Sequence, residues 1–514
     1  MRITLILVHI SMESIYTYSY IGTLISLVIW FWRVLKERST LLANVFFWGC
    51  VLLYIASVFF GAGGFFYKVF WVVPRDFAIF VAVALVANNL KSAKGFWVFG
   101  LVALGIFYTF FFKTLQKTFV INEGIDASAE LLMEVKDKKQ LQSLQALFDE
   151  YELRVEQAFP DIKYPENTRL DQYYAVDIPE KYAYKLSDIM EALDKENATG
   201  WIETNNMVSV DDPAADALEA QDQRPNYGLN DPSLGQLWAF EKMQMGEFYS
   251  LVKNAKPKKK AKIAILDTGV DAAHEDLKDN YSSTNSRYDR DVQGHGTHCA
   301  GIAAAVSNNK KGIASFAPNE RFVTVTSIKV LSDQGFGSQR SIIQGILKAA
   351  DEKADVISMS LGGYSNQSSQ RAYEEAIAYA QKAGAIVVVA AGNESTSANK
   401  VSPANCKGVI AVTALDQNLQ RAKFSNEVSQ IEYGVAAAGV QIFSTFPNNQ
   451  YKALNGTSMA TPYVAGLVGM LKAFKPELNT KEVYNILKST GLPTSNNRET
   501  GPFIQPVKAL KAVL

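Results

Sequence analysis

The pattern of apolar and polar positions divides the chain into three parts. In the first part, long uncharged apolar runs cover residues 15–32, 41–67 and 95–112, and a shorter uncharged stretch covers 77–90. A helix of about 20 apolar residues is long enough to cross the ~30 Å hydrocarbon core of a bilayer. The pattern therefore predicts a transmembrane region at 1–117 with three or four helices.

The placement of basic residues favours four spans. The loop after the first run carries Arg33, Lys36 and Arg38, and Lys and Arg prefer the cytoplasmic side. Four spans put the lysines at 91 and 94 on that same side. We therefore expect an integral membrane protein whose chain after residue 117 lies on the outer side, either periplasmic or extracellular. A cleaved signal peptide does not explain several successive apolar runs.

The second part has the pattern of a small α+β domain at 118–210. Strand-like alternation and helical spacing follow each other in the order β-α-β-β-α-β, over residues 129–135, 138–148, 152–159, 170–178, 180–194 and 201–210. Residues 211–232 have no periodicity and are rich in Asp, Ala and Pro. We interpret them as an accessible linker.

The third part, residues 233–514, alternates buried strands with helices. Apolar runs rich in β-branched residues cover 261–267, 322–331, 354–363, 385–393 and 409–415, and helical patterns cover 341–353, 370–383 and 460–474. Strands without polar alternation are buried on both faces, as in a parallel sheet. The fold class predicted is α/β, a doubly wound parallel sheet with helices on both faces.

Composition narrows the possible functions. The 514 residues include 51 basic and 51 acidic side chains, so the zero net charge gives no reason to expect a nucleic-acid partner. With 48% hydrophobic and 20% charged residues the chain is not mainly disordered. The three cysteines are far apart in sequence, which excludes a disulfide scaffold and a paired zinc or redox site.

Three polar residues stand where an α/β sheet places its chemistry, beyond the carboxyl ends of the strands. Asp267 closes the run at 261–267, His295 lies in GHGTHCAG, and Ser458 lies in NGTSMATPYVAG. A serine nucleophile needs a base and a group that orients this base, and an oxyanion needs donors, which Asn393 in AAGNES offers. Each residue alone is more often an ordinary cap or turn residue; together they indicate nucleophilic catalysis.

Five blocks, IAILDTGVD, GHGTHCAG, SLGG, AAGNE and GTSMATPYVAG, resemble the signatures of the subtilisin-like serine proteases, in that family's order Asp, His, Ser. The resemblance covers about residues 230–514 and implies a serine endopeptidase with catalytic Asp267, His295 and Ser458, and with Asn393 in the oxyanion hole. It also implies that substrate binds as an extended strand between two edge segments. The expected substrate-binding residues are Gly335, Gly337, Ser360, Leu361, Gly362 and Ala391.

The resemblance further implies a structural calcium ion and no cofactor for catalysis. Asp276 and Asn309 match positions at which relatives bind calcium, and oxygen ligands in a loop suit that ion. Lys310 and Lys311 flank the second ligand and would weaken the site. An ordinary Asn turn is the alternative.

The resemblance also implies a role for the domain at 118–210. Related enzymes carry an amino-terminal propeptide of this shape, which assists folding and leaves its tail in the active site. We expect such a propeptide here, with self-cleavage of the zymogen within 209–232. The expected partners are then a protein or peptide substrate, the chain's own propeptide and a lipid membrane.

Two other functions remain as alternatives. One is a non-catalytic binding or chaperone module on this fold, which a lost triad residue would indicate; none is lost. The other is a transmembrane receptor or transporter with an appended protease domain, which ionisable residues within the spans would indicate. The apolar region carries essentially only Arg75 and Asp76. A membrane-anchored, self-processed serine endopeptidase is therefore favoured.

Overall fold

The computed structural model describes Thr23 and residues 41–60, 124–210, 227–365 and 370–514. They belong to two compact units. The first takes in residues 1–130, 141–155 and 176–198, and the second takes in 131–140, 156–175 and 199–514. The predicted boundaries at 117, 210 and 232 stay predictions.

The membrane prediction is not upheld. Apart from Thr23, the apolar runs at 15–32, 77–90 and 95–112 lie outside the described residues, and the run at 41–67 is described only as helix α2 (Leu41–Phe60). Across the described residues, no helix is both long enough and apolar enough to cross a membrane. The prediction of an integral membrane protein with an outward-facing main domain is therefore wrong. An apolar run in a sequence indicates burial, but it does not determine the length of the helix that the run forms.

The order predicted for the α+β part is present in the structure. Two helices alternate with four strands of one sheet, whose order is β2-β3-β1-β4 and in which β1 and β4 are antiparallel. The bounds are β1 (Leu131–Val135), α7 (Gln145–Glu150), β2 (Arg154–Gln157), β3 (Tyr173–Asp177), α8 (Leu186–Asp194) and β4 (Thr199–Thr204). Short 3-10 helices, η3 (Lys138–Leu144) and η6 (Glu180–Lys185), precede α7 and α8.

The predicted doubly wound parallel sheet is confirmed. Its order is β14-β13-β11-β9-β6-β7, and all neighbouring strands are parallel. The bounds are β6 (Ala261–Asp267), β7 (Val323–Lys329), β9 (Val356–Met359), β11 (Ile386–Ala390), β13 (Val409–Leu415) and β14 (Gly434–Ala438). The five predicted runs each form a strand, and β14 was not predicted.

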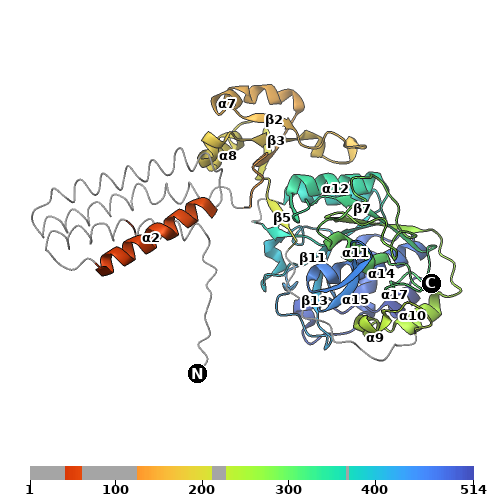
Figure 1. Cartoon of the computed structure of the whole chain (residues 1–514). Coiled ribbons are helices and arrows are strands. Elements are labelled where there is room, and N and C mark those ends of the chain that lie inside the picture. The colour runs from red at the N-terminus through yellow and green to blue at the C-terminus, as the bar shows by residue number, and fades with distance from the viewer. Residues whose placement is uncertain (1–22, 24–40, 61–123, 211–226, 366–369) are drawn as a thin grey trace, which may run out of the picture. The chain divides into compact units, whose positions relative to one another are not determined.

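Helices cover both faces of this sheet (Figure 1). Gly345 of α12 (Gln339–Asp351) lies against Leu266 of β6, whereas Gly469 of α14 (Thr457–Phe474) lies against Ile263. Side chains at odd and even positions of a strand point to opposite faces, so α12 and α14 lie on opposite sides. Helix α13 (Arg371–Lys382) packs with α12, and α11 (His295–Ala304) packs with α14.

Shorter elements complete the part described. A hairpin of β15 (Ile442–Phe446) and β16 (Gln450–Leu454) packs against α11. Two small ladders pair β5 with β8 and β10 with β12. The bounds are β5 (Met207–Ser209), β8 (Phe336–Ser338), β10 (Gly363–Tyr364), β12 (Val401–Ser402), α9 (Trp238–Lys242), α10 (Met245–Val252), α15 (Thr480–Thr490), α16 (Asn497–Thr500) and α17 (Pro506–Lys511).

Candidate active site

Asp267 and His295 meet at the carboxyl end of the sheet. Asp267 is the last residue of β6 and His295 is the first residue of α11. His295 Nδ1 lies 2.7 Å from Asp267 Oδ1, and the Thr268 N–H donates to the same oxygen at 2.7 Å. Both side chains are buried, with exposed fractions of 2% or less. A carboxylate held in this way selects the imidazole tautomer with its proton on Nδ1 and leaves Nε2 as the basic nitrogen.

Ser458 lies in the first turn of α14, next to the strand end that carries Ser360. Its Oγ is 3.4 Å from the Ser360 carbonyl oxygen, and the Ser360 hydroxyl donates to the Ser458 carbonyl oxygen at 2.8 Å. Cys299 connects this serine to the histidine, because its Sγ lies 3.5 Å from the Ser458 carbonyl oxygen and 4.0 Å from His295 Nδ1. The three predicted triad residues therefore surround one small region.

Asn393 follows β11 and is held by the start of α14. Its Oδ1 accepts hydrogen bonds from Thr457 N at 2.9 Å and from Thr457 Oγ1 at 3.0 Å. These bonds fix the amide orientation, so its Nδ2 faces away from Thr457 as a donor. Backbone N–H groups of the first turn of a helix have no partner within the helix. Asn393 is thus held against Thr457, the residue that precedes Ser458.

The predicted edge segments bind a strand of the chain itself. Ser209 of β5 and Gly362 form an antiparallel pair, with N–H to O distances of 3.3 and 3.4 Å. On the other side β5 is antiparallel to β8, and Val210 N donates to Gly335 O at 3.1 Å. Residues 207–210 therefore lie as a strand between the two segments expected to bind substrate.

Glycine is required at two positions of this groove. Gly335 has φ +84°, and an added Cβ would lie 2.8 Å from Val210. A Cβ on Gly337 would lie 2.4 Å from the Val330 carbonyl oxygen. Leu361 and Ala391 are buried, and the Ala391 carbonyl oxygen accepts from Asn426 Nδ2 at 3.0 Å.

Asp276 and Asn309 also come together. Asp276 Oδ1 accepts from Asn309 Nδ2 at 2.7 Å, and Oδ2 accepts from Ile313 N at 2.8 Å. A second buried carboxylate, Asp231, accepts from the backbone of the same loop. Burial raises the pKa of Asp276 to about 7, and the charge of Asp231 adds to this shift. Two buried carboxylates at one loop fit a cation of the Ca²⁺ type.

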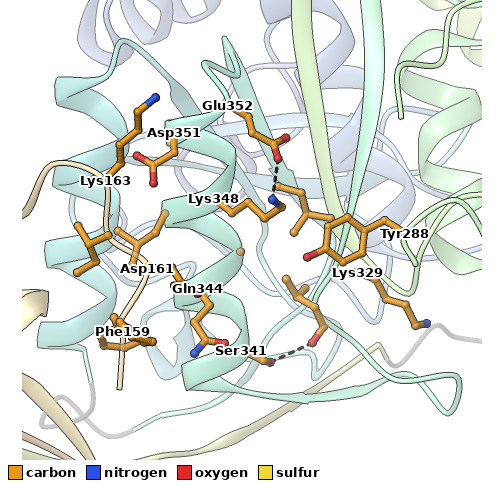
Figure 2. A pocket seen from close by; sticks show the side chains of 16 residues that line it. Phe159, Asp161, Lys163, Tyr288, Lys329, Ser341, Gln344, Lys348, Asp351 and Glu352 are labelled. Atoms are coloured by element: carbon orange, nitrogen blue, oxygen red, sulfur yellow. Dashed lines mark hydrogen bonds and ion pairs between the residues drawn. The ribbon is translucent and has the colours of Figure 1, made fainter. Parts of the chain in front are cut away.

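A pocket of 490 Å³ lies apart from the triad residues. Figure 2 shows that Phe159, Asp161 and Lys163 line one side of it, while Gln344, Lys348 and Asp351 of α12 line another. Lys348 pairs with Glu352 at 2.8 Å within this wall. The pocket contains none of the predicted site residues.

Sequence reasoning missed three residues that hold the site. Thr457 fixes Asn393, while Thr268 and the buried Asp291 fix the start of α11. Asp291 gave no signal, because it lies three residues before Gly294, the N-cap of α11, and so does not occupy the position that capping patterns use. Thr268 and Thr457 gave none either, because their partners are distant in sequence.

Comparisons with known proteins found relatives of this chain. The subtilase family (Peptidase S8) matches residues 258–503. Subtilisin DY of Bacillus licheniformis is 42% identical over 236 residues, which cover 45% of this chain and 82% of subtilisin DY. Thermitase of Thermoactinomyces vulgaris is 41% identical over 251 residues, which cover 48% of this chain and 85% of thermitase.

A solved structure from Pseudoalteromonas arctica, described as proteases, has 29% identity and a TM-score of 0.49, and covers 56% of this chain and 99% of its own.

The family match and these relatives show that the protein is a serine endopeptidase. The chain belongs to the subtilase family. As a protease it acts on protein substrates, and enzymes of this family need no cofactor for catalysis.

Proposed function

We propose that this subtilase hydrolyses peptide bonds with Ser458 as nucleophile, His295 as general base and Asp267 as the group that orients the base. The observation that carries the proposal is the 2.7 Å contact between Asp267 and His295 at the sheet edge, with Ser458 in the first turn of α14. The test is Ser458→Ala, which should abolish hydrolysis of peptides and cleavage of the chain itself.

In the first step Ser458 Oγ attacks the substrate carbonyl carbon while its proton passes to His295 Nε2. Asp267 stabilises the imidazolium that forms, and Asn393 Nδ2 and the Ser458 N–H stabilise the oxyanion. His295 then gives the proton to the leaving amine. Water, deprotonated by His295, releases the acyl group and restores Ser458.

We further propose that the enzyme cleaves its own chain shortly after Val210. Residues 207–210 lie where a substrate strand would bind, and Ser209 pairs with Gly362. A substrate strand that continued this antiparallel pairing would meet Ser360 two residues further along, and the Ser360 carbonyl oxygen lies 3.4 Å from Ser458 Oγ. The bond that is cut is then within one or two residues after Val210. This position falls inside the predicted range of 209–232.

Residues 203–206 support a propeptide role because they cap two helices of the catalytic fold. Arg340 N, at the start of α12, donates to Asn205 Oδ1 at 2.9 Å. Ala372 N, at the start of α13, donates to Glu203 Oε1 at 3.4 Å. Side chains that satisfy helix N-termini stabilise such a contact. The segment would thus hold α12 and α13 in place during folding and cover the groove until it leaves.

The pH dependence of propeptide release follows from Glu203. Burial raises the pKa of Glu203 to about 7, although hydrogen bonds from Trp201, Ala372 and Gln339 oppose this shift. The charged or titratable groups around it are Glu134 with its partners Arg169 and Arg371, together with Tyr173, Tyr373 and Cys406. Release returns Glu203 to an ordinary pKa near 4.5. The bound state therefore holds one extra proton between about pH 4.5 and 7.

We expect affinity for the cleaved propeptide to fall as pH rises through that window, by up to about tenfold per pH unit. The measurement compares two samples at the same dilution and pH. One is a self-cleaved preparation that still contains the propeptide, and the other is enzyme whose propeptide has been degraded. The ratio of their peptidase activities gives the fraction of enzyme free of propeptide. Glu203→Gln stays neutral and should flatten the profile. Glu152→Gln, at an exposed glutamate of the same domain, is the matched control. A variant profile as steep as that of the wild type would contradict the assignment to Glu203.

We also propose that Asp276 and Asn309 hold a structural calcium ion, with Asp231 as a nearby carboxylate. The two buried carboxylates leave negative charge that a cation would neutralise. Lys311, which flanks Asn309, is directed toward Glu275 with an Nζ to Oε2 distance of 3.8 Å. That pairing reduces the repulsion expected from its charge. The ion would fix the loop 306–313, and it takes no part in the reaction.

Removing calcium should lower the melting temperature of the enzyme by about 5–10 °C relative to enzyme at ~100 Kd of the ion. The Asp276 pKa of about 7 means that protons compete with the ion, so the difference should be larger at pH 8 than at pH 6. Calorimetry of the inactive Ser458→Ala chain, with chelator or with Ca²⁺, measures this. Asp276→Asn should remove the response. An identical melting temperature in both conditions at pH 8 would exclude the site.

A further inference from the structure

The helix that carries His295 begins in an unusual network of side-chain acceptors. Four successive N–H groups at the start of a helix lack partners within the helix. Here Gly294 N donates to Asp291 Oδ1 at 2.8 Å, His295 N to Gln293 Oε1 at 2.7 Å, and Thr297 N to Asp291 Oδ2 at 2.9 Å. Gly296 N donates to Thr268 Oγ1 at 3.0 Å. The first turn of α11 is therefore fully held.

Asp291 also reaches the strand end that carries Asp267. Its Oδ1 accepts from Thr268 Oγ1 at 2.9 Å, and its Oδ2 accepts from Thr297 Oγ1 at 2.7 Å. Each hydroxyl that donates to Asp291 leaves its lone pairs for an N–H donor. Thr268 Oγ1 accepts from Gly296, and Thr297 Oγ1 accepts from the Asp271 N–H at 3.0 Å. One carboxylate thus sets the direction of two hydroxyl bonds.

An ordinary helix cap would not need this connection. A cap satisfies one or two N–H groups of its own helix, whereas Asp291 additionally binds the residue that follows Asp267. Thr268 is itself fixed from three sides. Its N–H donates to Asp267, its hydroxyl donates to Asp291, and its carbonyl oxygen accepts from Lys329 Nζ. Asp291 is 6% exposed, so its carboxylate acts in a poorly hydrated place, where such bonds are strong.

We propose that Asp291 is a positioning residue for the reaction, which holds His295 against Asp267 by tying Thr268 and the first turn of α11 together. This inference rests on the proposed roles of His295 and Asp267. Asp291 accepts four hydrogen bonds and therefore needs both oxygens as acceptors. An asparagine would turn an NH₂ group toward one pair of donors. Loss of either pair lets the start of α11 shift relative to β6, and small errors in catalytic geometry are costly.

The test is Asp291→Asn in the full chain. We expect kcat to fall by about 10- to 100-fold with KM within about twofold, because only the alignment of the base is lost. Kinetics are normalised to active sites titrated with a fluorophosphonate. If the variant does not mature, the half-time of its own cleavage replaces kcat. The low-field proton NMR signal of the His295 Nδ1–H should also move or broaden. The matched control is Asp416→Asn, because Asp416 caps a turn of its own after β13.

A double-mutant cycle separates positioning from simple stabilisation. Thr268→Val removes the hydroxyl that connects Asp291 to Gly296. If the network acts as one unit, the double variant should lose much less kcat than the product of the two single fold-losses. Multiplicative effects, or an unchanged kcat and NMR signal with only a lower melting temperature, would overturn the proposal. Ser458→Ala remains inactive in either case, so failure here leaves the proposed function standing.

Discussion

The Ser458→Ala chain should remain full length and should hydrolyse no peptide above background. Loss of the nucleophile removes covalent catalysis, and the corresponding loss in kcat is about 10⁶-fold, a magnitude measured on the relative subtilisin. Ser458 is 3% exposed at the start of a fully buried helix, and alanine favours helix formation. The variant should therefore fold, and its loss of activity should be chemical.

The measurement combines peptide hydrolysis with intact mass and amino-terminal sequencing. Wild-type enzyme should begin within one or two residues after Val210, whereas the variant should retain the upstream sequence. Ser360→Ala is the matched control, because it also removes a hydroxyl beside the triad but leaves the proposed nucleophile intact; it should keep measurable activity. A Ser458→Ala chain that still matures alone at a concentration-independent rate would contradict self-cleavage by this site.

The sheet was predictable because its strands are buried on both faces. Such strands read as continuous apolar runs, and the predicted run at 409–415 coincides with β13. β14 escaped prediction because GVAAA consists of small residues with weak strand preference. The predicted strand at 201–210 is divided into β4 and β5, with Asn205 and Asn206 between them. Alternation continues through that break, so periodicity could not show it.

The sequence also did not show which charged residues are buried. Alternation at 129–135 indicates one solvent-facing side, yet all of β1 is buried. Glu134 is tolerated there because Arg169 Nε lies 2.6 Å from its Oε1 and Arg371 Nη2 lies 3.1 Å from its Oε2. Both partners are distant in sequence. The triad candidates could be named from the sequence because they follow or lie near strand ends. The hydrogen bonds among Asp291, Thr268 and Thr297 could not be predicted, because they join residues from separate segments of the chain.

Replacing Asn393 should have the second largest effect. We expect Asn393→Leu to lower kcat by about 100- to 1000-fold with little change in KM, because the amide donor acts on charge that develops only in the transition state. That range was measured on subtilisin and corresponds to about 2.7–4 kcal/mol. Active-site titration with a fluorophosphonate, followed by steady-state kinetics on one peptide, gives the two constants.

Asn393→Asp separates the donor from the acceptor of the same side chain. Asn393 Oδ1 accepts from Thr457 N and Oγ1, and leucine removes these bonds together with the donor. Aspartate keeps an acceptor for Thr457 but offers no N–H, and it brings negative charge toward the oxyanion. If the amide donor carries the effect, Asn393→Asp should melt close to the wild type yet lose at least as much kcat as Asn393→Leu. An aspartate variant with near wild-type kcat would mean that Asn393 acts only by holding Thr457.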